Sequence, residues 1–418
     1  MDIRIEPGPL GGAVAAIPSK SEAHRLLICA ALADRETTIR LSSSSEDIEA
    51  TLRCLEALGA GLCRTDGAVR VQPIRAVPPA PRLDCGESGS TLRFLLPVAA
   101  ALADEARFTG GGRLPERPIG QLAAAMADHG VTFSAEGLPF TTRGRLAAGD
   151  FALPGNVSSQ FFSGLLLALA ALGGDGTVRY LGELESAAYV ELTRRALSAF
   201  GVETATLAAG WAVPGGQRLR SPGLLAAEGD WSNAAFFLAA GALSDRGVTA
   251  TGLDPDSPQG DKAIQTLLAL AGGSVAWTPA GLRVRAGALR GFRADLRDTP
   301  DALPVLAVLA ACASGESQLT GAARLRLKES DRLAATARLI RDLGGGAEVL
   351  PDGLRVFGGG LRGGTVDGCG DHRIVMAAAV AACACREPVV IRGAEAVNKS
   401  YPGFFTDYTK LGGKIHVL

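Results

Sequence analysis

Histidine, aromatic residues and any excess of one charge are scarce in this chain. Among its 418 residues there are 4 His, 3 Trp and 4 Tyr, and the formal net charge is −1. A near-neutral chain is not a general nucleic-acid binder, so an anionic ligand must be held by a local concentration of positive charge. No apolar run reaches the roughly 18 residues of a membrane-spanning helix. We therefore expect neither nucleic acid nor a membrane as a partner.

Signatures of metal and nucleotide sites are also missing. The histidines lack the spacing of metal ligands, and the close pair Cys383 and Cys385 has no His nearby. There is no G-x-x-x-x-G-K-[ST] loop, no G-x-S-x-G and no strand followed by G-x-G-x-x-G. We expect no metal and no organic cofactor.

Features of secreted proteins are absent as well. The 8 Cys lie mostly in apolar runs such as LLICAAL, where cysteine behaves as a small core residue. The sequence starts with strand-like DIRIEP, so we expect no signal or transit peptide. We expect a cytoplasmic monomer that acts on small molecules.

Lysine is rare too, because arginine supplies nearly all of the 42 basic residues. Each lysine is therefore a candidate for a specific role. The six are Lys20, Lys262, Lys328, Lys399, Lys410 and Lys414.

Glycine, by contrast, is abundant, at 54 of 418 residues or about 13%, against a usual ~7%. Six amphipathic helical stretches each end in a glycine, which tolerates the left-handed conformation of a helix end. The spacing between these glycines is 71, 71, 71, 72 and 68 residues, which indicates an internal repeat. They are Gly59, Gly130, Gly201, Gly272, Gly344 and Gly412.

Each repeat combines hairpins with helices. A strand–turn–strand pattern follows the glycine, as in SVAWTPAGLRVRAG, and a third strand and another helix come next. The last repeat has only KIHVL, so we infer that DIRIEPG at the chain start is its missing partner. The pattern predicts about twelve helices in six β-rich units.

A unit of ~70 residues is small for a core of its own, so the units should share cores. Two groups of three give two α/β domains. The first spans residues 19–228, and the second combines residues 1–18 with 229–418. Helices inside each domain should be Ala/Leu-rich all round, as FLLPVAAALA is. An open solenoid is the alternative, whereas a β-helix does not suit two helices per unit.

The first helices of the first domain begin with groups suited to anions. Helix N-termini offer free N–H groups and partial positive charge, so they bind phosphate or carboxylate. The alternative is ordinary capping of the helix by serine. The residues concerned are Lys20, Ser21, Ser88, Ser90, Ser158 and Ser159.

The second domain has carboxylates at the corresponding places. Asp230, Asp301 and Asp371 lie near helix starts, where most aspartates are caps. Asp301 follows Pro300, and its carboxylate could also accept a hydroxyl proton.

LKESDR at 327–332 is the densest cluster of charge. We expect a helix here, on which Lys328 and Arg332 are four residues apart and can face one ligand, while Glu329 and Asp331 point elsewhere. The alternative is a solvated helix face with internal ion pairs.

Isolated cations form a further group of candidates. Arg373 begins an apolar helix, where it opposes the helix dipole and needs an anion beside it. Arg93 lies in an apolar helix, Arg117 in PERPIG and Lys399 in NKSYPG. Each could instead be an ordinary surface or paired cation.

Together these motifs resemble the enolpyruvyl transferases, and within them the enzymes that act on shikimate 3-phosphate. The resemblance runs nearly end to end through PSKSEAHR, ESGSTLR, ERPIG, NVSSQF, TPDA, LKESDR, DHR and NKSYPGFF. LKESDR with DHR is specific, whereas SKS or RPIG alone is weak. The family fold is a two-domain inside-out α/β barrel of six βαβαββ repeats, three per domain. The resemblance places the active site in the interdomain cleft, with shikimate 3-phosphate mainly on the N-terminal domain.

The resemblance implies an addition–elimination reaction. The 5-hydroxyl of shikimate 3-phosphate adds to C2 of phosphoenolpyruvate while C3 is protonated, and phosphate then leaves a tetrahedral intermediate. Asp301 is implied as the base, Glu329 as the proton donor to C3, and Lys20 as an aid to proton transfer. The residues implied to hold shikimate 3-phosphate are Lys20, Ser21, Arg25, Ser158, Ser159, Gln160, Ser186, Asp301 and Lys328. Those implied to hold phosphoenolpyruvate are Lys20, Gly89, Arg93, Arg117, Gln160, Arg332, Arg373 and Lys399.

The chain departs from the family pattern in three places. Glu87 replaces an Asn and brings an acid near the phosphoenolpyruvate site, Ala23 and His24 replace Ser-Asn, and Arg324 replaces another Asn. None of these changes removes an implied catalytic residue. Gly89 is retained, so we expect glyphosate to compete with phosphoenolpyruvate.

Two alternatives remain. A UDP-N-acetylglucosamine enolpyruvyl transferase shares the fold but usually carries a reactive Cys before R-P, and GGGRLPERPIG has none. A non-catalytic anion-binding protein of the same fold would not need Asp301, Glu329 and Lys20 together.

Overall fold

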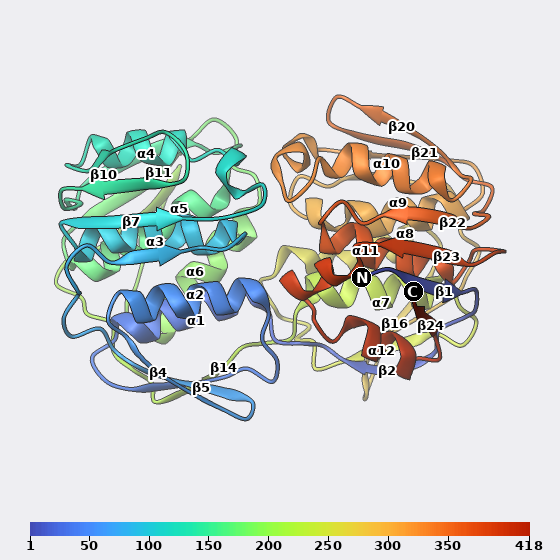
Figure 1. Cartoon of the computed structure of the whole chain (residues 1–418), viewed down its shortest axis with the longest axis horizontal. Helices are drawn as coiled ribbons and strands as arrows, with labels where there is room; N and C mark the ends of the chain where they lie inside the picture. The colour runs from blue at the N-terminus through green and yellow to red at the C-terminus, as the bar shows by residue number, and fades with distance from the viewer. The chain divides into compact units, whose positions relative to one another are not determined.

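The computed structural model describes residues 1–418 and divides into two compact units (Figure 1). Unit 1 contains Met1–Ile17 and Glu228–Leu418, and unit 2 contains Pro18–Ala227. The chain therefore crosses from one unit to the other twice. No helix has the length and apolar character needed to span a membrane.

Unit 2 has three four-stranded sheets, each built as a βαβαββ repeat. In the second sheet β6 and β7 run parallel, β9 is antiparallel to β7, and β8 completes the hairpin. The strands, in their order across each sheet, are β14 (Leu224–Ala226), β3 (Thr37–Arg40), β5 (Ala68–Gln72), β4 (Gly61–Thr65); β6 (Arg82–Asp84), β7 (Glu105–Thr109), β9 (Phe140–Arg143), β8 (Thr132–Phe133); and β10 (Asp150–Pro154), β11 (Gly176–Leu181), β13 (Gly210–Val213), β12 (Ala205–Leu207). The helices are α1 (Lys20–Leu32), α2 (Glu46–Ala57), α3 (Gly89–Leu102), α4 (Gly120–Ala127), α5 (Ser159–Leu172), α6 (Ala187–Ala199) and the short η1 (Leu114–Glu116).

Unit 1 repeats this plan. Its strands, again in spatial order, are β2 (Gly12–Ala15), β15 (Val248–Thr251), β17 (Gly281–Arg285), β16 (Ser274–Thr278); β18 (Arg293–Asp295), β19 (Glu316–Thr320), β21 (Gly353–Phe357), β20 (Gly346–Leu350); and β22 (Gly364–Asp367), β23 (Val389–Arg392), β1 (Ile3–Glu6), β24 (Lys414–Val417). The helices are α7 (Trp231–Ala242), α8 (Ile264–Leu270), α9 (Leu303–Cys312), α10 (Arg332–Asp342), α11 (His372–Ala382), α12 (Phe404–Lys410) and the short η2 (Gly260–Ala263), η3 (Pro300–Ala302), η4 (Ala323–Leu327) and η5 (Ala394–Lys399). The predicted α/β fold of six repeats is confirmed.

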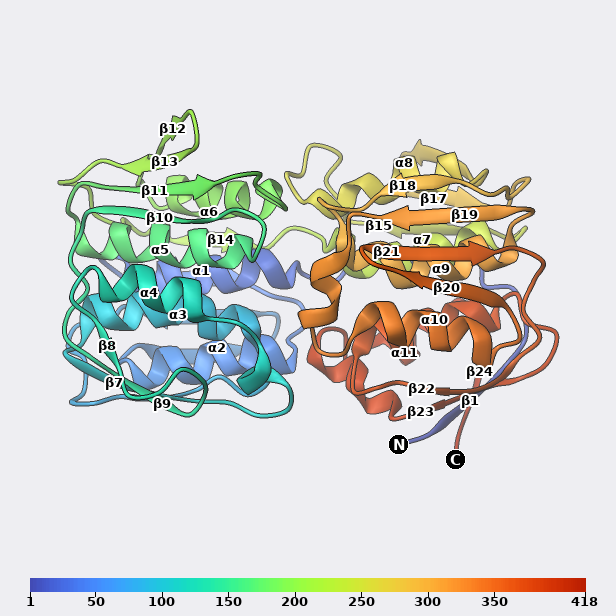
Figure 2. The same ribbon diagram turned by 90° about the horizontal axis from the view of Figure 1, so that it is seen from above.

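The strand just before each crossing belongs to a sheet of the unit that the chain is leaving, whereas the helix that follows it belongs to the other unit. β2 precedes α1 of unit 2 but pairs in parallel with β15 of unit 1, and β14 precedes α7 of unit 1 but pairs in parallel with β3 of unit 2. At the other end of the repeat series, β1 lies between β23 and β24 and is antiparallel to both. The predicted pairing of the two chain ends is confirmed, and the ends lie next to each other in both views (Figures 1 and 2).

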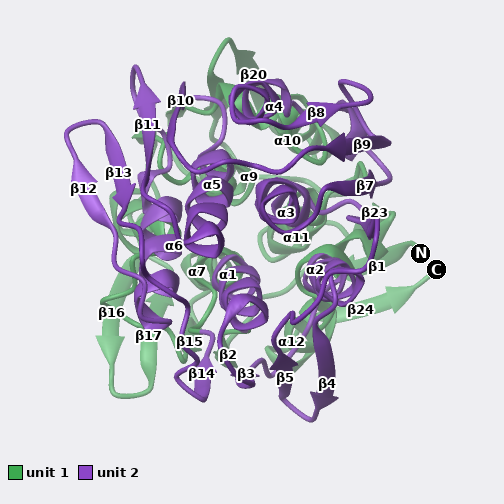
Figure 3. Ribbon diagram, turned by 90° about the vertical axis from the view of Figure 1, so that its left-hand side faces the viewer, with its two compact units in different colours: residues 1–17, 228–418 green, residues 18–227 purple.

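Each unit has a hydrophobic core of its own, built around its inner helices. All eleven residues of α11 are buried, as are nine of the ten in α9. In unit 2 the helices α1, α3 and α5 lie inside, with the strands around them (Figure 3). Because these helices are apolar all round, polar side chains concentrate in their first turns, and those turns carry the candidate functional residues.

The repeat glycines end helices as the spacing predicts. All six have positive φ, between 78° and 103°, which a residue with a β-carbon adopts only at a cost. They are Gly59, Gly130, Gly201, Gly272, Gly344 and Gly412.

Candidate active site

In unit 2 the inner helices begin with serine caps. Ser19, Ser88 and Ser158 accept hydrogen bonds from main-chain N–H groups in the first turns of α1, α3 and α5, at 3.2–3.3 Å. The capping alternative for these serines is therefore found in the structure. The residues just after the caps, such as Lys20 and Ser159, remain candidates for binding a ligand.

Lys20 is held by a carboxylate that the sequence did not single out. Its Nζ lies 2.7 Å from Oδ2 of Asp47, on the first turn of α2. Both side chains are mostly buried, with 16% and 11% of their surface exposed. The main-chain carbonyl of Asp47 also accepts from Thr91 Oγ1 on α3. The sequence pattern does not distinguish Asp47, because acidic residues are common in the first turn of a helix.

Arg93 and Gln160 meet between α3 and α5. Nη1 of Arg93 donates to Oε1 of Gln160 at 2.8 Å, and Nε2 of Gln160 donates to Ser90 Oγ at 2.8 Å. Nη2 of Arg93 donates to the carbonyl of Pro118 at 3.1 Å. The amide thus fixes the guanidinium at the start of both helices, beside the loop that leads to Arg117.

Arg117 lies directly against Gly89. A β-carbon on Gly89 would be 2.7 Å from Cζ and Nη1 of Arg117, closer than atoms can approach. Arg117 is 8% exposed. A glycine at this position is therefore a steric requirement for the placement of the guanidinium.

Arg25 is engaged inside unit 2. Its Nε donates to Thr193 Oγ1 and its Nη2 to the carbonyl of Tyr189, both at 2.7 Å, and its guanidinium lies 4.7 Å from the ring centre of Phe94. Its Nη1 donates to the carbonyl of Ser21. Burial lowers the pKa of Arg25 to about 10. At 1% exposure Arg25 joins α1 to α6, and its predicted contact with a ligand remains a prediction. Ser186, which precedes α6 with φ 55°, is likewise 3% exposed.

In unit 1 one arginine gathers three carboxylates. Arg332 is 1% exposed and bonds to Asp301 at 2.7 Å, to Glu329 at 2.6 Å, and to Asp371 at 2.7 and 3.1 Å. Asp371 is fully buried, caps α11 and also accepts from Ser330 Oγ at 2.9 Å. The two predicted proton-transfer residues, Asp301 and Glu329, are thus joined through a single guanidinium.

The predicted helix through LKESDR is wrong. Asp331 caps α10 by accepting from Ala334 N, so the helix begins only at Arg332, and residues 328–331 precede it. Lys328 and Arg332 still reach one group, because both approach Oδ1 of Asp301, at 3.6 and 2.7 Å. Glu329 was expected to point elsewhere, but without the helix its side chain turns back to Arg332.

Asp301 has an unusual electrostatic environment at the start of α9. Burial by itself would raise its pKa, but Arg373, Lys328 and Arg332 together hold the pKa of Asp301 well below its usual range. Arg373 Nη2 lies 3.4 Å from Oδ2 of Asp301 and 2.8 Å from Ser232 Oγ, on α7. The anion that Arg373 was predicted to need is therefore Asp301.

Lys399 lies at the end of η5 and donates to the carbonyl of Gly370 at 2.7 Å, next to Asp371. It contacts the loop that starts α11. The structure therefore brings together Asp301, Lys328, Glu329, Arg332 and Arg373 in unit 1. Lys399 contacts the loop before α11, next to Asp371.

The three departures from the family pattern lie in different surroundings. Ala23 and His24 are fully buried on α1, and His24 Nδ1 lies 2.7 Å from Thr51 Oγ1. Glu87 precedes the cap of α3 and covers Gly112, where a β-carbon would be 2.2 Å from its Oε2. Arg324, in η4, donates to the carbonyl of Arg297. Only Glu87 lies in the segment that carries Gly89.

Comparisons with known proteins identify the family of the chain that carries these residues. The profile of EPSP synthase (3-phosphoshikimate 1-carboxyvinyltransferase) matches residues 5–408. The chain belongs to the EPSP synthase family. A 3-phosphoshikimate 1-carboxyvinyltransferase of Clostridium kluyveri is 40% identical over 420 residues, covering 99% of this chain and 98% of the relative. One of Halobacterium salinarum is 41% identical over 427 residues, covering 99% of each.

Solved structures agree with this family. EPSP synthase from Acinetobacter baumannii superposes with a TM-score of 0.82 at 26% identity, covering 100% of both chains. The enolpyruvyl transferase NikO from Streptomyces tendae reaches a TM-score of 0.81 at 21% identity and supports the fold alone. EPSP synthases are transferases that catalyse enolpyruvyl transfer in the shikimate pathway, on small-molecule substrates. The family favours this activity over that of the UDP-N-acetylglucosamine enzymes.

Proposed function

We propose that the chain transfers the enolpyruvyl group of phosphoenolpyruvate to the 5-hydroxyl of shikimate 3-phosphate and releases phosphate. One observation carries the assignment of roles. Asp301 and Glu329, a candidate base and a candidate acid, share the guanidinium of Arg332, within an EPSP synthase chain. Acid–base addition and elimination needs two such groups close together.

The base is inactive until substrate arrives. With three cations around it, Asp301 is ionised but accepts a proton poorly, because its pKa is held low. The phosphate and carboxylate groups of the substrates draw on Lys328, Arg332 and Arg373, and the pKa of Asp301 then rises. Asp301 takes the proton of the 5-hydroxyl as its oxygen attacks C2, and Glu329, in its protonated form, gives its proton to C3. In the elimination that follows, the Glu329 carboxylate takes a proton back from the C3 methyl group while the C2–O bond to phosphate breaks, so that phosphate leaves and the enolpyruvyl double bond forms again.

Both units supply groups that hold anions. Lys20, Arg93, Arg117 and Gln160 of unit 2, with the main chain at Gly89, are proposed to bind phosphoenolpyruvate together with Arg332, Arg373 and Lys399 of unit 1. Lys328 and Asp301 of unit 1 belong to the shikimate 3-phosphate set. The remaining residues of the shikimate 3-phosphate set in unit 2 are Ser21, Arg25, Ser158, Ser159 and Ser186. The bonds that fix Arg93 to Gln160 and place Arg117 against Gly89 support the first assignment.

We also propose that the protein is a cytoplasmic monomer whose substrates bind in the cleft between its two domains. The roles assigned above support this arrangement, because they come from both units. Domain closure on the substrates would exclude water from the intermediate. Small-angle scattering with and without both substrates tests closure, and unchanged curves would contradict it. Light scattering after gel filtration tests the monomer.

One assay decides the function. Phosphate release from phosphoenolpyruvate is measured with shikimate 3-phosphate, with UDP-N-acetylglucosamine and with no acceptor. We expect release only with shikimate 3-phosphate. Release only with the UDP-sugar would assign the chain to the other transferase, and no release with either acceptor would favour a binding protein.

A further inference from the structure

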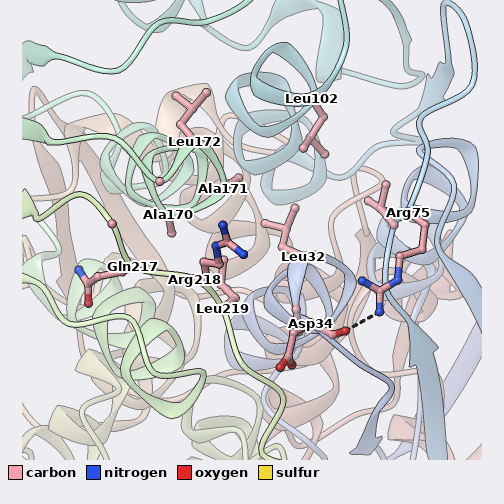
Figure 4. A pocket seen from close by; sticks show the side chains of 14 residues that line it. Leu32, Asp34, Arg75, Leu102, Ala170, Ala171, Leu172, Gln217, Arg218 and Leu219 are labelled. Carbon is pink, nitrogen blue, oxygen red and sulfur yellow. Dashed lines mark hydrogen bonds between the residues drawn. The ribbon is translucent and has the colours of Figure 1, made fainter.

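A cavity in unit 2 lies away from every proposed substrate residue. Its volume is about 540 Å³, within the usual range of small-molecule pockets. The last residues of α1, α3 and α5 line it, together with residues 74–75 and 216–219 (Figure 4). Lys20, Gly89 and Ser159 begin those same helices. At 1.5 Å of rise per residue, the cavity is roughly 20 Å from these helix starts.

The wall of the cavity is apolar and incompletely covered. Leu32, Ile74, Leu102 and Leu172 pack against the core of unit 2 but are only partly buried. Figure 4 shows the side chains of Leu32, Leu102 and Leu172 around the cavity, together with Ala170. A ligand with an apolar body would remove this surface from water, which is favourable in proportion to the area covered.

Two arginines at the cavity have no carboxylate partner. Arg218 forms no hydrogen bond or ion pair, and Arg75 donates only to the main-chain carbonyl of Asp34. The carboxylate of Asp34 accepts from Ser221 N at 2.8 Å, and this bond is the main cause that lowers the pKa of Asp34. The lining therefore has two positive charges and one negative charge.

Nor are these arginines used to cap the helix ends. The carbonyls of Ala31, Ala100 and Gly173 accept instead from the main-chain N–H groups of Ile74, Leu146 and Gly216. Guanidinium groups bind carboxylates in a bidentate fork, and most of the donors of Arg75 and Arg218 remain available for that.

We propose that this cavity binds a small carboxylate with an apolar body. The carboxylate bonds to Arg218 and Arg75, and the body packs against the leucine wall. The site is separate from that of the substrates, so both are occupied at the same time.

Calorimetric titration of the full chain with 4-phenylbutyrate tests the proposal, with the neutral 4-phenylbutyramide as the matched ligand. We expect the acid to bind and the amide to bind at least tenfold more weakly, since a charge-assisted bond is lost. Arg218→Ala should weaken binding of the acid about tenfold. Ala171→Phe should weaken it as well, by occupying part of the cavity without changing charge. Arg107→Ala, at an exposed arginine of β7 outside the lining, is the matched control and should bind as the parent chain does.

Melting temperature and turnover show that each variant is folded, and neither should change. Shikimate 3-phosphate with phosphoenolpyruvate should not displace the acid. The proposal is overturned by no binding at millimolar acid, by equal binding of acid and amide, or by displacement by the substrates. Unchanged binding in both Arg218→Ala and Ala171→Phe would overturn it too.

Discussion

The two units use one repeat for two kinds of chemistry. In unit 2 the inner helices α1, α3 and α5 are capped by serine, whereas in unit 1 Asp230 and Asp371 cap α7 and α11. Serine and aspartate are nearly equal as caps, so the choice between them costs the fold little. It does change the charge at the helix start, because an aspartate cap adds a negative charge in unit 1 where a serine cap in unit 2 adds none.

The difference extends to the networks behind the caps. In unit 1 the cluster around Arg332 is ionic, with Asp301, Glu329 and Asp371 on one guanidinium. In unit 2 a buried chain of neutral groups runs from His24 through Thr51 and Thr91 to Ser88, with successive contacts of 2.7–2.8 Å. Proton transfer is therefore expected to fail on changes in unit 1, and binding on changes in unit 2.

The largest effect is expected at the base in unit 1. Asp301→Asn keeps the shape of the side chain but removes the proton acceptor, so turnover should fall at least about 100-fold. Phosphate release at saturating substrates measures it. Asp295→Asn, in an exposed pair with Arg297, is the control and should retain turnover. Near-normal turnover of the Asp301 variant would remove Asp301 from the mechanism.

The counterpart in unit 2 is Gly89→Ala. Its β-carbon would collide with Arg117, so the guanidinium must move, and the KM for phosphoenolpyruvate should rise about tenfold or more. The turnover number should change less, because binding rather than proton transfer is impaired. Gly120→Ala is a close control, since Gly120 also begins a helix but has nothing within 4 Å. Equal effects of the two substitutions would contradict the steric argument.

The repeat could be predicted from the sequence because each repeat has a glycine at the same helix end. The backbone at each helix end takes a positive φ, as at Gly59 and Gly344, and glycine adopts this conformation most easily. This requirement depends only on the local chain, so the sequence shows it. The pairing of β1 with β24 was predictable because the last repeat lacked one strand. The site was harder, since Asp47 looks like any acid in a first helical turn, and only the packing of α2 beside α1 brings it to Lys20. The break before Arg332 likewise depends on Asp331 acting as a cap, which spacing alone does not show.

Asp47→Asn tests whether unit 2 also contributes to proton transfer. The amide cannot form the ion pair with the ammonium of Lys20, so the position of Lys20 becomes less defined, and turnover should fall about tenfold. Steady-state assays separate the turnover number from the KM. Glu49→Gln on the same helix changes an exposed pair with Arg64 and an exposed bond from Ser44 Oγ, and it should have little effect. A rise in KM with unchanged turnover would limit Lys20 to binding.

The smallest effect concerns the neutral network of unit 2. Burial, with Lys20 and Arg25 nearby, lowers the pKa of His24 well below 6.5. Below pH ~6.5 the unfolded chain therefore binds a proton that the folded chain does not. Stability contributed by neutral His24 is complete above that pH and is lost as the pH falls, by up to about 1.4 kcal/mol per pH unit.

Urea unfolding at pH 7.5 and 5.5 measures this loss. His24→Asn removes the titrating group, so its free energy of unfolding should fall less between the two pH values than that of the parent chain. His416→Asn, which changes an exposed side chain, should keep the parent dependence. If the His24 variant keeps the parent pH dependence of the free energy of unfolding as well, another group causes the acid sensitivity. If the variant loses this pH dependence, the network of unit 2 is stable only while it is uncharged, whereas the network of unit 1 depends on its charges.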